Sequence, residues 1–169
     1  AYEPNKIKST NDWCDDIDFL INDSVKLRMQ SDVKVGTFLS GGIDSSLITA
    51  VANKNSGISE IIAFTVGFSE RNWDESLIAK SLAEKYKLNH EVIFLEPSLE
   101  ETLSQLVWHY EEPFSDSSSI PTYYLCKAAS KFGTVFLSGD GGDEIFAGYK
   151  RYMTVDANNL IDLIPKSLR

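Results

Sequence analysis

Two short loops carry the residue types best suited to chemistry in this chain. The first is Ser40–Ser45, with the sequence Ser-Gly-Gly-Ile-Asp-Ser, between an apolar run at 33–39 and a helix-like stretch at 46–52. Glycines let the backbone turn sharply and bring N–H groups close to a ligand. The N-terminus of the following helix adds free N–H groups and a partial positive charge. The pattern therefore predicts a site for an anion such as phosphate.

Asp44 gives this loop a particular chemistry. The common phosphate loop G-x-x-x-x-G-K-[ST] places a lysine beside the phosphates, whereas this loop carries an aspartate. A carboxylate repels phosphate unless a cation lies between them, so Asp44 indicates Mg²⁺. Taken alone, the stretch could also be an ordinary helix start, because Ser and Asp are frequent capping residues and Gly-Gly is a frequent loop dipeptide.

The second loop, Ser138–Glu144, repeats the order of strand, glycine loop and helix. Its acids Asp140, Asp143 and Glu144 lie close together, which costs energy unless a cation is present; a solvated acidic turn is the alternative. Loops that leave the carboxyl ends of parallel strands share one edge of the sheet. We therefore expect Asp44 and Asp143 to hold one Mg²⁺ over the phosphates of a nucleotide.

The elements that must position these loops alternate along the chain. Apolar residues at near-helical spacing predict helices over 13–29, 45–54, 74–87, 98–110 and 121–133. Apolar or β-rich runs predict strands over 34–39, 61–68, 91–95 and 134–137. Ser98 and Glu101 form a predicted capping box, and Pro121 is the predicted first residue of its helix. This alternation with short loops predicts a three-layer α/β fold with a parallel sheet.

Composition narrows the classes of function. A net charge of −9 argues against nonspecific binding to nucleic acid or to an anionic membrane. No apolar run reaches transmembrane length and the first residues lack signal-peptide character, so the expected location is the cytoplasm. Cys14 and Cys126 are isolated in the sequence, and we expect them to be ordinary packed or surface thiols. His90 and His109 are isolated too, and we expect them to be structural rather than metal ligands.

Several motifs carry a family resemblance. Ser40–Ser45 resembles the pyrophosphate-binding loop of ATP pyrophosphatases, and S-G-D-G-G-D-E-I-F-A-G-Y at Ser138–Tyr149 resembles the signature of the synthetase domain of the asparagine synthetase family. Phe64–Phe68, Asp74–Ser76 and Glu111–Tyr123 are similar to the same family in the same order. The resemblance implies a Rossmann-like sheet of the adenine nucleotide α-hydrolase type, with ATP and Mg²⁺ as cofactors.

The resemblance also implies a reaction. In the family, an aspartate carboxylate attacks the α-phosphorus of ATP, pyrophosphate leaves, and ammonia converts the β-aspartyl adenylate into asparagine and AMP. Asp140 is then expected near the acyl substrate and Glu144 beside the metal, as the catalytic pair, with Asp44 and Asp143 as metal ligands. Pyrophosphate binding is assigned by position to Ser40, Gly41, Gly42, Asp44 and Ser45. Adenosine contacts are assigned by position to Leu39, Val66, Ser138 and Gly139.

The extent of the chain leads to a further expectation. Glutamine-using members of the family have an N-terminal glutaminase domain and a longer synthetase domain. We expect a single partial synthetase domain over 1–169, without the glutaminase domain or the C-terminal part of the family domain. The expected source of ammonia is a glutaminase domain or subunit, and homodimerisation is left open.

Two alternative functions also remain open. One is amidation of another carboxylate, such as a sugar acid, or β-lactam-type ring closure. The other is nucleotide binding without turnover.

Overall fold

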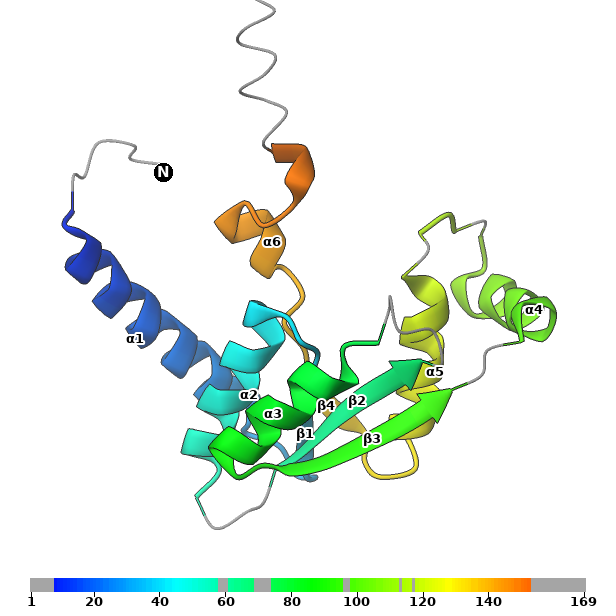
Figure 1. Cartoon of the computed structure of the whole chain (residues 1–169), viewed down its shortest axis with the longest axis horizontal. Coiled ribbons are helices and arrows are strands. Elements are labelled where there is room, and N and C mark those ends of the chain that lie inside the picture. Colours follow the sequence, from blue (N-terminus) through cyan, green and yellow to red (C-terminus); the bar gives the residue numbers. More distant parts are fainter. Residues whose placement is uncertain are drawn as a thin grey trace, which may run out of the picture. The chain divides into compact units, whose positions relative to one another are not determined.

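The computed structural model describes residues 8–57, 61–68, 74–95, 98–112, 114–116 and 118–152. The chain divides into two compact units, Ala1–Ser138 and Gly139–Arg169. The first unit contains, in chain order (Figure 1), α1 (Thr10–Arg28), β1 (Val35–Phe38), α2 (Ile43–Asn55), β2 (Ile62–Phe68), α3 (Ser76–Tyr86), β3 (Asn89–Leu95), α4 (Leu99–Tyr110), α5 (Ser119–Ala129) and β4 (Val135–Leu137). The second unit contains α6 (Gly142–Phe146) and the 3₁₀ helix η1 (Lys150–Tyr152).

The four strands form one parallel sheet in the order β3-β2-β1-β4. β1 is an inner strand, flanked by β2 through the pair Thr37 and Ala63 and by β4 through the pair Val35 and Val135. Because β1 and β4 are neighbours and parallel, the residues that follow them leave the same edge of the sheet. The predicted parallel α/β fold is confirmed.

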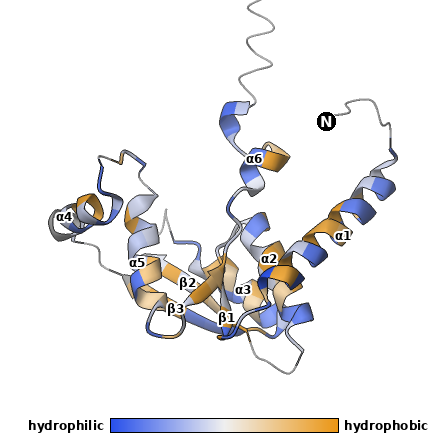
Figure 2. Ribbon diagram, turned by 180° about the vertical axis from the view of Figure 1, so that it is seen from behind, coloured by the Kyte–Doolittle hydropathy of each residue, from blue (hydrophilic) through white to orange (hydrophobic). Residues whose placement is uncertain are grey.

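Helices cover both faces of this sheet. In Figure 1, α2 and α3 lie in front of the strands and α5 lies behind them, and Figure 2 shows the same layers from the opposite side. On the α3 face, Leu39 of the β1 end and Ala63 of β2 pack against Ala79 and Ala83 of α3. Burial of such apolar surface is the main stabilising contribution to a layered fold.

Aromatic rings fill the opposite face. Phe64 of β2 is only 1% exposed. Its ring meets Phe136 of β4 edge-on at 5.3 Å and lies 4.9 Å from Phe132, which follows α5. The ring of Phe38 stacks on Phe136 at 5.0 Å. Edge-to-face and stacked pairs at these distances add to the apolar burial, so β1, β2 and β4 are joined by rings as well as by the strand ladder.

The N-termini of α1 and α4 differ from their predictions. α1 begins at Thr10, before the predicted 13, because Ser9 and Asp12 form a reciprocal capping box. The capping box predicted at Ser98 is wrong, since the Ser98 side chain makes no capping hydrogen bond; the side chain of Glu101 lies outside the described ones. Instead, the Ser98 N–H donates to the Tyr124 hydroxyl at 3.2 Å. A tertiary contact with α5 therefore replaces the local one.

The last helix of the first unit is shorter than predicted. α5 begins at Ser119, so Pro121 is its third residue rather than its first, and the helix ends at Ala129 rather than near 133. Proline is tolerated there because the first-turn N–H groups have no intrahelical partner. Within the described part of the chain, no helix combines the length and the apolar character needed to cross a bilayer.

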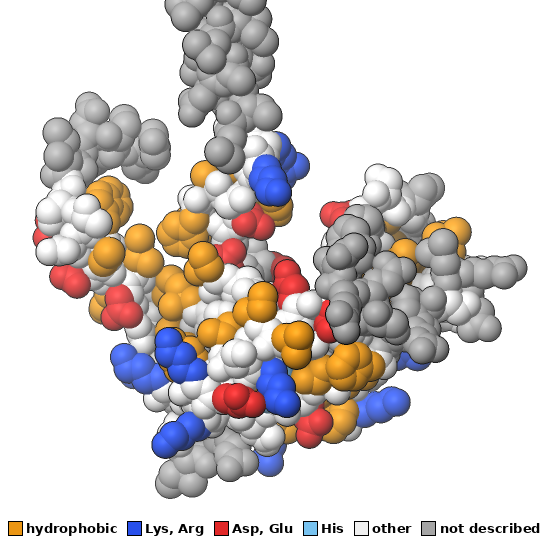
Figure 3. Space-filling view, viewed as in Figure 1, with side chains coloured by type: hydrophobic (Ala, Val, Ile, Leu, Met, Phe, Trp, Pro, Cys, Tyr) orange, Lys and Arg blue, Asp and Glu red, His pale blue; other side chains and the backbone are white. Residues whose placement is uncertain are grey.

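The outer face over α1, α2 and α3 presents apolar side chains beside charged ones (Figure 3). The exposed apolar residues of these helices include Phe19, Leu20, Leu47, Leu77 and Ile78. Exposed apolar side chains make up much of an ordinary protein surface. This surface therefore suggests no binding partner by itself.

Candidate functional site

The first predicted loop follows β1 directly and is anchored to β2. Leu39 is 3% exposed, and its N–H donates to the Phe64 carbonyl at 2.7 Å. Its carbonyl accepts a hydrogen bond from the Thr65 hydroxyl at 2.6 Å. Both backbone groups of Leu39 are thus held by β2, so the start of the loop is fixed relative to the sheet.

Hydroxyl groups inside the loop hold its curvature. The Ser40 N–H donates to Ser45 Oγ at 3.1 Å, and the two serine hydroxyls lie 2.8 Å apart. The Gly42 N–H donates to Ser40 Oγ at 3.1 Å. Ser40 and Ser45, which were both predicted to bind pyrophosphate, therefore also connect the two ends of the loop.

The loop continues into α2 with an open helix N-terminus. Gly42 is the N-cap in extended conformation and provides no side-chain cap. The N–H groups of Ile43, Asp44 and Ser45 lie in the first turn, where no intrahelical acceptor exists. Asp44 is half-buried in this turn. The arrangement has the unpaired donors and dipole end that favour an anion.

Gly41 is the point at which the loop touches another helix. Its N–H donates to Glu75 Oε2 at 3.0 Å. A Cβ at this position would lie 3.2 Å from Ile78 Cβ and 3.3 Å from Glu75 Cβ, which is tighter than ordinary packing. Only glycine fits here without displacing α3. No role for Glu75 was predicted from the sequence, because nothing in the local pattern connects residues so far apart in the chain.

A buried hydrogen-bond chain supports the loop from β3. Thr65 gives its one hydroxyl proton to Leu39, so His90 Nε2, at 2.7 Å from Thr65 Oγ1, is the donor in the next contact. Burial lowers the pKa of His90 below its ordinary value of 6.5, which favours the neutral ring. This contact is structural, as predicted for His90. Val66, a predicted adenosine contact, follows Thr65 on β2 and is half-buried.

Ser138 is the last residue of the first unit and follows β4. It is half-buried and leaves the sheet at the same edge as Leu39 and Ser40, because β1 and β4 are adjacent and parallel. The sheet therefore brings together the strand ends from which both predicted loops start.

The second unit holds the acidic residues of the other loop. Gly141, with φ of +90°, precedes the short helix α6, whose first turn contains Asp143 and Glu144. The Gly148 N–H donates to the Asp143 carbonyl at 3.0 Å, and a Cβ on Gly148 would overlap Asp143 Oδ1. A side chain at Gly148 would therefore displace the Asp143 carboxylate. Asp140 is exposed before α6, and Gly139 is half-buried.

Glu144 is tethered by a tyrosine. The Tyr149 hydroxyl donates to Glu144 Oε1 at 2.8 Å. This hydrogen bond, together with one from the residue's own backbone, lowers the pKa of Glu144, and the same contact raises the pKa of Tyr149. The Arg151 guanidinium lies 4.3 Å from the centre of the Tyr149 ring. These contacts of Gly148 and Tyr149 were not predicted, although both residues belong to the sequence motif that ends at Tyr149.

The metal prediction rests on the chemistry of two aspartates. Asp44 and Asp143 each lie in the first turn of a helix, and carboxylate oxygens are the ligands that Mg²⁺ prefers. Among the described residues, no group of three or more His, Cys, Asp or Glu side chains is gathered as a metal site. The two aspartates belong to different units, and their joint role stays a prediction.

Comparison with known proteins gives a consistent result. Residues 16–166 match the family model described as asparagine synthase. The chain is 43% identical over 151 residues to a putative glutamine-hydrolysing asparagine synthetase of Methanocaldococcus jannaschii, covering 89% of this chain and 29% of that protein. It is 40% identical to a glutamine-hydrolysing asparagine synthetase of Bacillus subtilis, covering 88% and 23%. The chain thus spans about a quarter of the length of these curated relatives.

Solved structures with low sequence identity share the fold. The tRNA thiolase NcsA from Methanococcus maripaludis aligns with a TM-score of 0.55 at 17% identity, covering 91% of this chain and 53% of that one. The ammonia-dependent NAD synthetase of Campylobacter jejuni aligns with a TM-score of 0.51 at 17% identity, covering 80% and 60%. The parallel sheet with flanking helices is therefore the arrangement of the ATP pyrophosphatase type, as predicted.

Proposed function

The chain belongs to the asparagine synthase family, and from this we propose that it forms the nucleotide-binding part of an ATP-dependent amide-forming ligase. The observation that carries the proposal is the first loop. It joins β1 to α2 through two glycines, and it leaves the first-turn N–H groups of α2 open to an anion. The family match over 16–166 includes this loop and the second one.

We propose the reaction of the family for the complete protein. A carboxylate oxygen of aspartate attacks the α-phosphorus of ATP, the bond from the α-phosphorus to the bridging oxygen breaks, and pyrophosphate leaves with the electron pair. Ammonia then attacks the acyl carbon, AMP leaves, and asparagine forms after loss of a proton. Relatives are named as glutamine-hydrolysing, which supports a glutaminase domain or subunit as the source of ammonia.

The chain's own residues take distinct parts in this proposal. Mg²⁺, when bound, neutralises charge on the leaving pyrophosphate. Asp44 and Asp143 would hold that ion, Asp140 would lie next to the acyl substrate, and Glu144 would act beside the metal. The pyrophosphate is bound by backbone and hydroxyl donors of Ser40, Gly41, Gly42 and Ser45. The adenosine is contacted by Leu39, Val66, Ser138 and Gly139. Donors placed before the reaction begins stabilise charge as it develops, without further reorganisation.

Calorimetric titration with ATP tests the nucleotide site directly. We expect the chain to bind ATP in the presence of Mg²⁺ and to lose most of that affinity when EDTA removes the metal. Pyrophosphate exchange that depends on aspartate, measured in a longer protein with the remaining family domain, then tests the acyl substrate. Binding that is indifferent to Mg²⁺ would contradict the role of Asp44, and exchange with other carboxylic acids but not with aspartate would contradict the substrate.

A further inference from the structure

The Gly41 amide differs from the other loop amides in its acceptor, which is the Glu75 carboxylate. Ser40 and Gly42 donate their N–H groups to serine hydroxyls, which are neutral and belong to the loop itself. Gly41 donates to a carboxylate that comes from another helix, at 3.0 Å. A carboxylate oxygen and a phosphate oxygen are both anionic acceptors, so Glu75 takes the place that an oxygen of a bound anion would take.

One amide proton cannot serve two strong acceptors at full strength. If the pyrophosphate group uses the Gly41 N–H, the Glu75 carboxylate must first leave it. Repulsion between the Glu75 carboxylate and a pyrophosphate group bound to the same loop favours the same exchange. The loop also packs closely against α3. A Cβ at Gly41 would come closer to Glu75 Cβ and Ile78 Cβ than ordinary packing allows.

The backbone of Glu75 is fixed while its carboxylate can move. Glu75 is the N-cap of α3, and its carbonyl accepts hydrogen bonds from the N–H groups of Ile78 and Ala79 at 3.1 and 3.0 Å. Ser76 and Ala79 are buried, and Asp74 Oδ1 accepts from the Ser76 N–H at 3.1 Å. The Glu75 side chain itself is exposed. Release of Gly41 therefore needs only a rotation of one side chain, without movement of α3.

We propose that Glu75 is an internal competitor for the anion loop, which binds the Gly41 N–H until the pyrophosphate group of the nucleotide displaces it. The inference rests on the proposed function, since it regulates the same loop. A competing acceptor lowers the apparent affinity by the fraction of molecules in which the loop is released. Nucleotide binding and the position of the Glu75 side chain are thereby coupled.

Glu75→Ala removes the competitor, and Glu75→Gln keeps a neutral acceptor. Glu84→Ala removes an exposed acid from the same helix and is the control for net charge. We measure hydrogen exchange of the Gly41 amide by NMR, and pyrophosphate affinity by calorimetry at fixed Mg²⁺. In Glu75→Ala we expect faster exchange at Gly41 and about tenfold tighter binding, which corresponds to a contact formed in about nine-tenths of molecules. Glu75→Gln should be intermediate, and Glu84→Ala should match the unmodified chain.

The possible results separate this inference from the proposed function. Pyrophosphate binding that is equal in the unmodified chain and in Glu75→Ala overturns the competition and leaves the anion loop intact. Weaker binding in Glu75→Ala also overturns it, since Glu75 would then assist the ligand. Unchanged Gly41 exchange shows that the contact is not formed in solution. If no variant binds pyrophosphate, the anion loop of the proposed function fails, and the competition fails with it.

Discussion

Two hydrogen bonds of the Thr65 hydroxyl attach the start of the first loop to the sheet. Thr65 has one hydroxyl proton, which it gives to the Leu39 carbonyl, so the next link depends on His90 as donor through Nε2. The chain of contacts runs from β3 through β2 to the last residue before the loop. Such networks are cooperative, since each bond orients the next. A substitution of His90 should therefore affect the loop indirectly, through Thr65 and Leu39.

His90 should make stability depend on pH. Burial lowers its folded pKa, with nearby Lys80 acting in the same direction and Glu91 opposing it. The unfolded chain then binds the proton more readily, so the contribution to stability is full above the ordinary value of 6.5 and is lost as the pH falls below it. We therefore expect the thermal unfolding midpoint, followed by circular dichroism, to fall as the pH is lowered below 6.5. This decrease should begin at a higher pH than the titration of carboxylates.

The two histidines of the chain provide the matched comparison. His90→Gln should flatten the dependence on pH in this window. His109→Gln should retain it, because His109 lies exposed on α4. Equal slopes in both variants and in the unmodified chain would show that another group causes the dependence.

At the scale of elements, the aromatic face holds β2 and β4 on either side of β1. Phe64 is the largest fully buried side chain of the described residues. Phe64→Ala should reduce the free energy of unfolding by about 3–5 kcal/mol, because a large cavity forms between the sheet and the segment after α5. Urea unfolding measured by fluorescence gives this difference.

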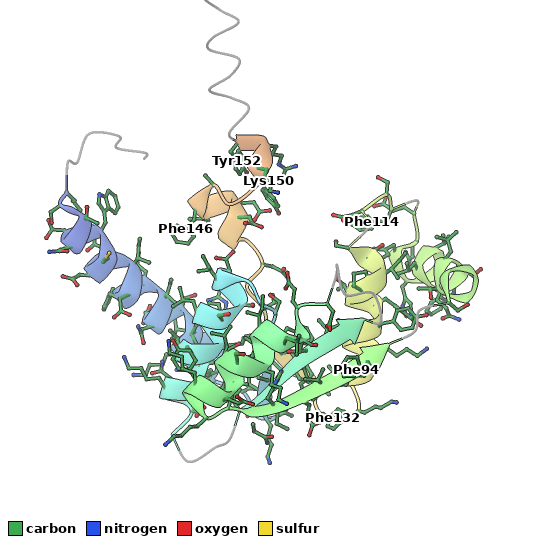
Figure 4. The ribbon with its side chains drawn as sticks, viewed as in Figure 1. Phe94, Phe114, Phe132, Phe146, Lys150 and Tyr152 are labelled. Atoms are coloured by element: carbon green, nitrogen blue, oxygen red, sulfur yellow. The ribbon has the colours of Figure 1, made fainter. Side chains whose placement is uncertain are left out.

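Phe94 is the control for the same substitution. It is 68% exposed on the edge strand β3 (Figure 4). Phe94→Ala should change the free energy of unfolding by less than about 1 kcal/mol, as is usual for surface positions. A large loss at Phe94, or a small one at Phe64, would mean that the aromatic face is not the main packing of the sheet.

Sequence patterns predicted the elements where the signal was local. The run that became β2 is nearly continuously apolar, and its predicted limits of 61–68 differ from Ile62–Phe68 by one residue. The capping box predicted at Ser98 failed because a tertiary contact with Tyr124 takes its place, and the capping box at Ser9 was not predicted. The loop motifs were likewise visible in sequence, whereas the contact from Glu75 to Gly41 depends on how α3 packs.

At the scale of the whole molecule, the proposed metal ligands come from two compact units. Asp44 belongs to Ala1–Ser138 and Asp143 to Gly139–Arg169. If both hold one ion, their effects on Mg²⁺-dependent ATP binding must be coupled. A double-mutant cycle of Asp44→Asn and Asp143→Asn should then be non-additive by about 0.5–3 kcal/mol, with the double variant losing less than the sum.

An unrelated acid provides the reference for this cycle. Asp32 is exposed in the loop before β1. Asp32→Asn combined with Asp44→Asn should be additive, as measured by the same calorimetric titrations. Additive losses for Asp44 and Asp143 would show that the two carboxylates act on separate ligands.

The pairing of β1 with β4 has a consequence for the order of folding. Val35 pairs with Val135, whereas β1 and β2 pair through Thr37 and Ala63, much closer along the chain. Loop closure costs more entropy as the intervening chain lengthens, and non-local contacts slow folding. As the chain emerges during synthesis, the ladder of β3, β2 and β1 can assemble before β4 exists. Such an intermediate would carry a formed anion loop long before β4 joins the sheet.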